Sequence, residues 1–404
     1  MSPATRQMVL INAAHLFTHY CLLILPTAVL AMVGSGSAFG PEYGPIMALA
    51  TGMFVLYGLF SLPQGWIAAR IGRKLLMTIF FVGTGISLMA CGLAATPLML
   101  GITLAATGFF AAIYHPIGTA MLVEAAGNRP GRAIGINGVF GNVGVALAPV
   151  ITAFLVVQGG WHLAFVLPGL ACLATGLIWM RVPAHDPQAS RYAMSFPPIP
   201  RHIVRRAVIV LLLIAVVSGL VFNAFTLLLP KLMQERLASD ADLLPLVGAA
   251  AFIATLCGGA TQLTVGRMID RTTLKRVFLP MALVLAPALV ALAFVQGWMV
   301  LPVAGLVAAV VFGQVTVNET MTARYISPAL RTRMYSVRFF VGFLGSAMAA
   351  PVVGFLHERT GTLQASVLVL AGFAVVTLGC ALFFPDRREE LEPALWARVP
   401  APAE

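Results

Sequence analysis

The sequence predicts an all-α membrane protein in which twelve transmembrane helices form two six-helix bundles. Three observations lead to this fold class. Of the 404 residues, 60% are hydrophobic and only 10% are charged, whereas a soluble domain carries about 25% charged residues. Twelve apolar runs are long enough to cross a bilayer. Two turns that lie 201 residues apart share a residue pattern, which indicates an internal duplication.

The twelve predicted spans follow one another with short polar turns between them. They lie near residues 8–33, 45–69, 75–94, 98–123, 133–158, 162–181, 205–230, 244–266, 276–295, 299–323, 333–356 and 363–385. No small-residue cleavage site follows Arg6 and the first apolar run, so we expect this run to be a retained span rather than a signal peptide.

One long polar break divides the chain. Residues 182–204 contain five prolines, which forbid a continuous helix. We therefore expect an amino-terminal bundle over 1–181, a cytoplasmic linker over 182–204, a carboxy-terminal bundle over 205–385 and a cytoplasmic tail over 386–404.

The distribution of lysine and arginine predicts the orientation. On one side of the predicted membrane lie 22 of the 25 basic residues, and only Lys231, Arg236 and Arg359 lie on the other. The positive-inside rule then places both termini in the cytoplasm. We expect the protein to lie in the inner membrane of the cell. The net charge of +11 does not indicate nucleic-acid binding, because the charges lie in short turns and not on one polar face.

The repeated turn follows the second span of each half. Gly65, Arg70 and Lys74 recur as Gly266, Arg271 and Lys275. Two membrane halves in parallel repeat are typical of transporters that rock about a site between the halves.

This turn, the twelve spans and the duplication resemble the major facilitator superfamily. The family signature is a glycine, a small or apolar pair, an acid, an arginine and then glycine-arginine-lysine. The first copy matches it at Gly65, Arg70, Gly72, Arg73 and Lys74, with Ala69 at the acid position; the second keeps Gly266, Asp270, Arg271 and Lys275, with Thr273 in place of a glycine. The resemblance implies that the turn latches one conformation, and simple anchoring by positive charge is the alternative.

Residues 10–160 are similar to the fosmidomycin-resistance branch of the drug–proton antiporters. The similarity rests on Asn12-Ala13-Ala14-His15 with Pro26, on Tyr114-His115-Pro116, and on the run Gly138 to Gly144 followed by Pro149. That branch has acids near His19 and Ile117, which this chain lacks. The resemblance therefore supplies no carboxylate for proton coupling.

Polar side chains inside a bilayer are costly and mark candidate pathway residues. His15 and His19 lie one turn apart on one face of the first span, about 10 and 16 Å deep at about 1.5 Å per residue. An imidazole exchanges protons near neutral pH, which suits coupling to a proton gradient. The alternatives are hydrogen bonding across a helix interface and a metal site that adds His115 and nearby methionines. Neither a metal ion nor a cofactor is expected.

The second half contains a candidate ion pair. Glu319 and Arg338 lie equally far from the turn between the tenth and eleventh spans, so an antiparallel hairpin brings them to similar depth. Buried charges are tolerated when they are paired, so we expect a static pair or a gate that protons or substrate operate. The remaining pathway candidates are Gln314 and Asn318 in the tenth span, His115 beside a kink at Pro116, and Tyr57 and Asn223, which can equally bond between helices.

Glycines recur at every third position along the fifth span, at Gly138, Gly141 and Gly144. Small residues at this spacing allow a second helix to approach closely. A similar run that ends in a proline, here Pro149, marks the fifth span of drug–proton antiporters. The resemblance therefore favours export, and close packing alone is the alternative.

The sequence predicts a secondary active transporter for a small organic solute, and not an enzyme. Proton-coupled export is the first hypothesis, and proton-coupled uptake of a small organic anion, with Arg338 or the histidines facing it, is the second. No phosphate-binding loop is present, so ATP is not the expected fuel. The expected partners are the substrate, protons and the lipid bilayer, with a monomeric chain and no nucleic acid. A metal-ion carrier and a sensor that does not transport are more distant alternatives.

Overall fold

A computed structural model describes residues 3–34, 37–125, 130–183, 201–237, 244–269, 272–326, 334, 337–343 and 347–385. The regular elements within these residues are all helical. Much of the predicted linker and the whole of the predicted tail, together with Asp270 and Arg271, lie outside the described residues.

Ten helices precede the linker. They are α1 (Pro3–Leu22), α2 (Leu25–Met32), α3 (Tyr43–Ala48), α4 (Ala50–Ser61), α5 (Gln64–Ile71), α6 (Arg73–Gly92), α7 (Pro97–Ala111), α8 (Tyr114–Ala125), α9 (Pro130–Gly159) and α10 (Trp161–Arg181). The helices after it are α11 (Arg201–Leu237), α12 (Leu244–Ile269), α13 (Leu274–Phe294), the 3-10 turn η2 (Gly297–Met299), α14 (Val300–Tyr325), α16 (Ala349–Thr360) and α17 (Gln364–Phe383). Residues 337–343 are also helical.

Eleven stretches of the described chain are long and apolar enough to cross a membrane. They correspond to eleven of the twelve predicted spans. The remaining span is the eleventh in chain order, predicted over 333–356. It contains the helical residues 337–343 and the start of α16, and residues 344–346 between them lie outside the description. The arrangement is consistent with twelve crossings.

Prolines divide several of the predicted spans. Proline lacks the N–H of a helical hydrogen bond and restricts the residue before it. The first span breaks at Leu23–Ile24, just before Pro26, and the fourth breaks at Ala112–Ile113, just before Pro116. The predicted kink at Pro116 is therefore confirmed. The prediction of one helix over 45–69 is wrong, because Pro63 separates α5 from α4.

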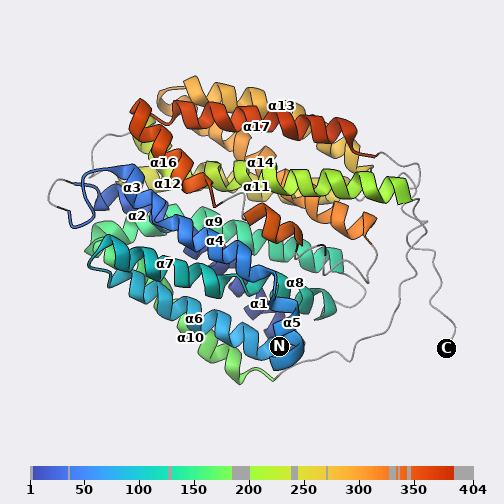
Figure 1. Cartoon of the computed structure of the whole chain (residues 1–404), viewed down its shortest axis with the longest axis horizontal. Coiled ribbons are helices and arrows are strands. Elements are labelled where there is room, and N and C mark those ends of the chain that lie inside the picture. Colours follow the sequence, from blue (N-terminus) through green and yellow to red (C-terminus); the bar gives the residue numbers. More distant parts are fainter. Residues whose placement is uncertain are drawn as a thin grey trace.

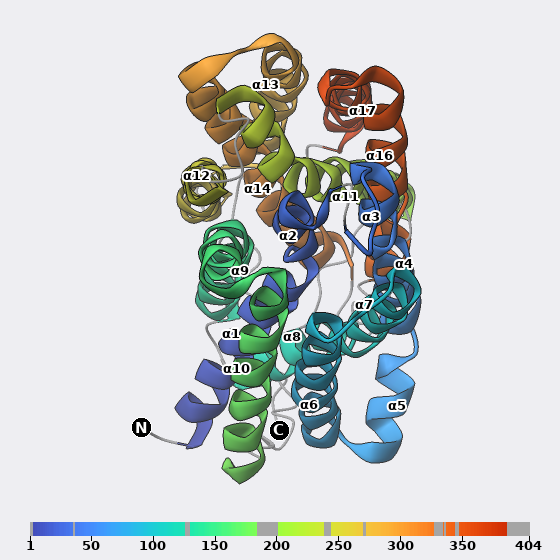
Figure 2. The same ribbon diagram turned by 90° about the vertical axis from the view of Figure 1, so that its left-hand side faces the viewer.

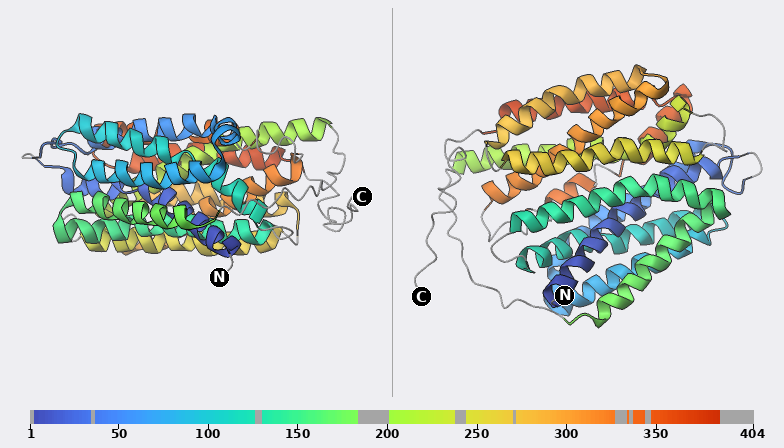
Figure 3. Two further views of the ribbon diagram at one scale, coloured as in Figure 1. Left: turned by 90° about the horizontal axis from the view of Figure 1, so that it is seen from below. Right: turned by 180° about the vertical axis from the view of Figure 1, so that it is seen from behind.

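The two halves of the chain lie side by side, with α1, α6, α7, α9 and α10 in the lower part of Figure 1 and α11, α13, α14 and α17 in the upper part. The main contacts between the halves join α9 to α12, α2 to α11 and α3 to α16, and these pairs are neighbours in Figure 2. The long helices run along a common axis, as both views of Figure 3 show. Residues on the facing helices are therefore positioned to form a site between the halves.

At the end of the molecule that contains α3, the two halves meet backbone to backbone. A Cβ atom added at Gly44 would lie 2.9 Å from the carbonyl oxygen of Gly354. The Gly44 amide also donates a hydrogen bond to Glu358 Oε1 at 2.8 Å. We call this contact the Gly44–Gly354 seam, and it lies at the opposite end from the turn around Lys74.

The repeated lysines make equivalent contacts in the two halves. Lys74 Nζ donates to the Val182 carbonyl at 2.7 Å and to that of Met180 at 3.3 Å, at the C-terminal end of α10. Lys275 Nζ donates to the carbonyls of Leu382 at 2.9 Å and Phe384 at 3.2 Å, at the end of α17. A cation at this position satisfies free carbonyls and interacts favourably with the helix dipole. The match supports the duplication inferred from the sequence.

We expect Lys74→Met and Lys275→Met to destabilise the protein by similar amounts, about 0.5–1 kcal/mol each, because each removes one cation from a helix C-terminus. Thermal unfolding of the purified protein, followed by tryptophan fluorescence, measures the effect. Arg70→Met is the control, since Arg70 is exposed in the same turn. A larger loss for Arg70→Met than for Lys74→Met contradicts the assignment.

Candidate functional site

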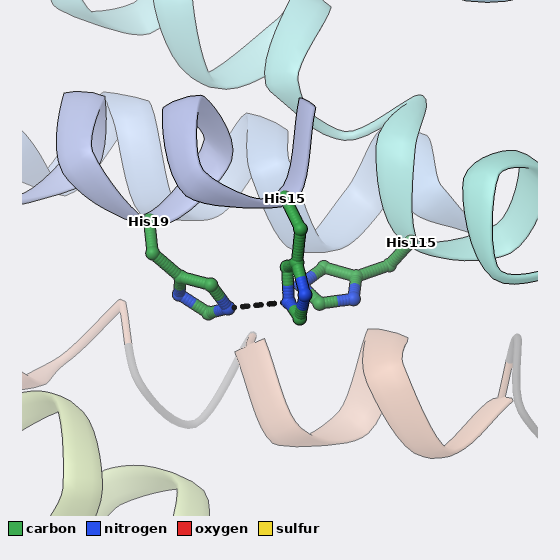
Figure 4. A group of neighbouring side chains, drawn as sticks. All are labelled: His15, His19 and His115. Carbon is green, nitrogen blue, oxygen red and sulfur yellow. Dashed lines mark hydrogen bonds between the residues drawn. The ribbon is translucent and has the colours of Figure 1, made fainter. Parts of the chain in front are cut away.

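Three histidine rings lie against one another in the first half of the chain. His15 and His19 come from α1, and His115 comes from the first turn of α8, as Figure 4 shows. The ring centroids are 4.9 Å apart for His15 and His19, 5.2 Å for His15 and His115, and 5.4 Å for His19 and His115. We call these residues the histidine cluster. The break before Pro116 matters here, because it sets the direction in which α8 presents His115.

The hydrogen bonds of His15 define the role of each of its ring nitrogens. Nδ1 lies 2.7 Å from the carbonyl oxygen of Asn137. A carbonyl oxygen only accepts, so Nδ1 must carry a proton and donate it. The other ring nitrogen, Nε2, lies 3.1 Å from Nε2 of His19. In a neutral His15 ring, Nε2 is therefore the acceptor, and His19 donates to it.

Asn137 on α9 is the hub of this polar network, and the sequence reasoning missed it. Its side-chain Nδ2 donates to Asn12 Oδ1 at 2.8 Å, and its Oδ1 accepts from the Tyr114 hydroxyl at 3.1 Å. The Tyr114 ring in turn stacks on His15, with centroids 5.0 Å apart. The sequence signal that could have identified Asn137 is an amide side chain within an apolar span. The structure shows that this side chain is buried.

The second half of the chain covers the histidine cluster with aromatic rings. Phe339 stacks on His115 with centroids 4.9 Å apart, and Phe343 lies 5.9 Å from the same ring. Tyr57 on α4 lies 4.4 Å from Phe343 and 6.2 Å from His115. The cluster and Tyr57 thus lie at the interface between the halves, where a transporter of this architecture places its site.

The ion pair expected between Glu319 and Arg338 is present. Arg338 Nη1 donates to Glu319 Oε1 at 2.7 Å, and the two side chains are 9% and 26% exposed. The guanidinium also lies 5.3 Å from the centre of the Phe339 ring. Because Phe339 also stacks on His115, the pair and the histidine cluster share one aromatic neighbour.

The remaining pathway candidates lie on α14 and α11. Gln314 and Asn318 are buried, and Gln314 Nε2 and Asn318 Oδ1 have no hydrogen-bond partner within the described residues. Asn318 directly precedes Glu319, so its side chain belongs to the same region of α14. Asn223 donates to the carbonyl of Gly219 in its own helix at 2.8 Å.

The glycines of α9 allow it to pack closely against α1. A Cβ atom at Gly141 would lie 2.6 Å from the His15 ring, and one at Gly144 would lie 2.3 Å from the Leu16 carbonyl oxygen. Gly138 faces Gln262 of α12, which accepts a hydrogen bond from Asn142. Pro149 lies within α9, with its carbonyl oxygen 2.8 Å from a Cβ position at Gly248. The run thus contacts both the histidine cluster and the other half.

The basic turns lie at the end away from the Gly44–Gly354 seam. Gly72 adopts a φ of +82° between α5 and α6, a conformation that glycine accommodates without strain. Gly65 and Gly266 face open space. A latch between the halves at these turns stays a prediction, and the described contacts of Lys74 and Lys275 lie within their own halves.

Comparison with known families decides the class of protein. The family model of the Major Facilitator Superfamily matches residues 13–259 and 237–403. The chain belongs to this superfamily. The bacterial homologue of the human lysosomal transporter Spinster is similar over 95% of both chains, with a TM-score of 0.67 and 15% identity in its inward-facing, unoccupied form. Its inward-facing, occupied form gives a TM-score of 0.66 and 14% identity over the same share of each chain.

Two curated relatives match a shorter stretch of this superfamily member. A probable hexose phosphate transport protein of Chlamydia pneumoniae is 22% identical over 151 residues, which are 37% of this chain and 32% of that protein. The gallate transporter of Pseudomonas putida is 31% identical over 144 residues, 35% of this chain and 31% of that protein. The matched stretch spans about a third of each relative. The family match identifies a multi-pass membrane protein of this transporter superfamily, and not an enzyme. The fosmidomycin-resistance branch stays a prediction.

Proposed function

We propose that this transporter carries a small organic anion together with a proton into the cell, across an inner membrane in which both termini face the cytoplasm. The observation that carries the proposal is the Glu319–Arg338 ion pair, which lies next to the histidine cluster at the interface between the halves. This is the second of the two hypotheses drawn from the sequence.

The chemistry of the pair couples a proton to an anion. A guanidinium binds carboxylate and phosphate groups through parallel hydrogen bonds. In the structure the Glu319 carboxylate occupies this anion-binding position on Arg338, with Oε1 2.7 Å from Nη1. A proton on Glu319 removes the negative charge and leaves the buried Arg338 without a counter-ion, which is costly. An anionic substrate then takes the place of the carboxylate. Proton and anion therefore bind together and leave together.

The surroundings of Arg338 suit an organic anion. Phe339, Phe343 and Tyr57 offer aromatic surface, while Gln314 and Asn318 offer polar atoms that have no partner within the described residues. Gallate and a hexose phosphate, the compounds after which the two relatives are named, are both anions at neutral pH. The relatives thus support the substrate class.

The coupling to a proton favours uptake over export. The cell interior is negative, so an anion leaves without help but needs a compensating charge to enter. A proton that binds with the anion provides that charge. Export by proton exchange is the second candidate, since the glycine run of α9 that resembles drug–proton antiporters contacts His15.

Liposomes that contain the purified protein and a trapped pH indicator test the proposal. We expect the interior to become more acidic when gallate or a hexose phosphate is added outside, because each anion brings a proton with it. The same measurement on Glu319→Gln should show no acidification. Liposomes without protein control for proton leak.

The sign of the pH change separates the candidates. Alkalinisation of the interior on substrate entry indicates proton exchange and supports the second candidate. Entry of labelled substrate with no change in internal pH contradicts proton coupling altogether. A wild-type protein that moves neither these anions nor other carboxylates and phosphates contradicts the substrate class.

A further inference from the structure

We propose that His15, His19 and His115 form a binding site for a divalent transition-metal ion such as Zn²⁺. Within the described residues, these three are the group of metal-ligating side chains whose ligand atoms all lie within 4.8 Å of one another. They reach one point from two helices, α1 and α8, as Figure 4 shows. The proposal goes beyond the proposed function, and it does not depend on the identity of the transported substrate.

The spacing of the ring nitrogens fits a tetrahedral ion. Zinc–nitrogen bonds of about 2.0–2.1 Å in a tetrahedron place two ligand nitrogens about 3.3 Å apart. Nε2 of His15 and Nε2 of His19 are 3.1 Å apart. These two nitrogens therefore need to separate only slightly to bind one ion, and a rotation of the His115 ring supplies the third ligand. The ion replaces the hydrogen bond between the first two.

The outer contacts of His15 are those of a metal ligand. A ligating histidine almost always donates its second ring N–H to a carboxylate, a carbonyl or water, which fixes the tautomer that presents the other nitrogen to the ion. His15 Nδ1 donates to the Asn137 carbonyl at 2.7 Å and so presents Nε2 toward His19. Asn137 is itself held by Asn12 and Tyr114. This arrangement orients His15 before any ion binds.

Two further atoms beside the cluster lack partners. Nε2 of His115 and the hydroxyl of Tyr57 are buried and have no hydrogen-bond partner within the described residues, and His115 as a whole is only 9% exposed. A buried polar atom without a partner is costly. An ion at the cluster would satisfy His115, and the Tyr57 hydroxyl is available to a group bound to that ion.

The ligand types determine the kind of ion and its fourth ligand. Imidazole suits zinc, copper and nickel, whereas magnesium and calcium prefer oxygen ligands. Three neutral imidazoles leave both charges of the ion uncompensated inside the membrane, which requires an anion at the open fourth position. Hydroxide or the carboxylate of an organic anion at that position neutralises one of the two charges.

Metal binding to the purified full chain, with any histidine tag removed, tests the site. We expect Zn²⁺ titrated into the protein in detergent to bind with one high-affinity ion per chain, measured by calorimetry. Co²⁺ in its place should give the visible absorption of a tetrahedral site. His19→Gln and His115→Gln should each weaken Zn²⁺ binding at least tenfold. His162→Gln is the matched control, because its Nδ1 also donates to a backbone carbonyl, that of Gly92, at 2.7 Å, but outside the cluster.

The outcomes separate this proposal from the preceding one. Glu319→Gln should keep full Zn²⁺ affinity even though it loses proton coupling. Thermal unfolding without metal verifies that each variant folds, and Zn²⁺ should raise the melting temperature of the wild type and of His162→Gln but not that of the cluster variants. Absence of stoichiometric binding to the wild type overturns the proposal. Equal affinity in His19→Gln, His115→Gln and His162→Gln also overturns it.

Discussion

Arg338→Ala is expected to abolish transport, with a fall of at least about a hundredfold in the initial rate. Arg338 and Glu319 are 9% and 26% exposed, so this substitution breaks a partly buried ion pair, which is destabilising because the remaining carboxylate loses its guanidinium partner. Here the charge left behind is that of Glu319, and the group lost is the proposed anion ligand. Labelled substrate uptake into liposomes measures the rate, and fluorescence-detected size-exclusion chromatography measures the amount of folded protein.

The matched control is Arg359→Ala. Arg359 also lies over a phenylalanine ring, that of Phe355 at 4.7 Å, but it is exposed and lies in the last turn of α16. We expect this variant to transport at the wild-type rate. A double variant, Glu319→Arg with Arg338→Glu, should recover folding and part of the transport if the pair acts as a pair. Full transport by Arg338→Ala, or a double variant no better than the single ones, contradicts the assignment.

Gly144→Ala is expected to destabilise the protein by about 1–3 kcal/mol, the usual cost of overpacking a core. The added methyl group would lie 2.3 Å from the Leu16 carbonyl oxygen. That oxygen belongs to the backbone of α1 and cannot rotate away, so α9 and α1 must separate. Because α1 carries His15 and His19, the same substitution should also disturb the histidine cluster.

Gly135→Ala, on the same helix, should instead stabilise the protein. Among the described residues, no atom lies within 4 Å of a Cβ atom at Gly135, and alanine is more favourable than glycine in a helix by about 0.8–1 kcal/mol. Thermal unfolding of both variants in one detergent tests the pair. A stabilising Gly144→Ala would mean that α9 and α1 are not packed as closely as the structure shows.

Composition and hydropathy were sufficient to predict the membrane class and eleven of the twelve helical spans, because a bilayer allows few other solutions for so apolar a chain. The division into two six-helix bundles stays a prediction. The repeated turn predicted an equivalence that the contacts of Lys74 and Lys275 support. The superfamily resemblance predicted from that turn is confirmed by the family match. Breaks within spans were harder to place, and only the one at Pro116 was expected.

The site was only partly predictable, because it depends on how separate helices pack. His15 and His19 are neighbours by helical spacing alone, and the hairpin argument brought Glu319 to Arg338. The arrival of His115 beside them depends on the break before Pro116 and on the packing of α1 against α8. Asn137 was missed, since one sequence does not show which face of α9 meets α1. The aromatic cover by Phe339 arises from contact between the halves.

The Gly44–Gly354 seam has a consequence for how the protein changes shape. The two glycine backbones approach closely, and the Glu358 side chain lies at the same contact and accepts a hydrogen bond from the Gly44 amide. Separation of the halves at this end therefore requires the loss of the close Gly44–Gly354 contact and of the Gly44–Glu358 hydrogen bond. If this end has a closed and an open state, the population of the open state limits how fast a solute enters from that side.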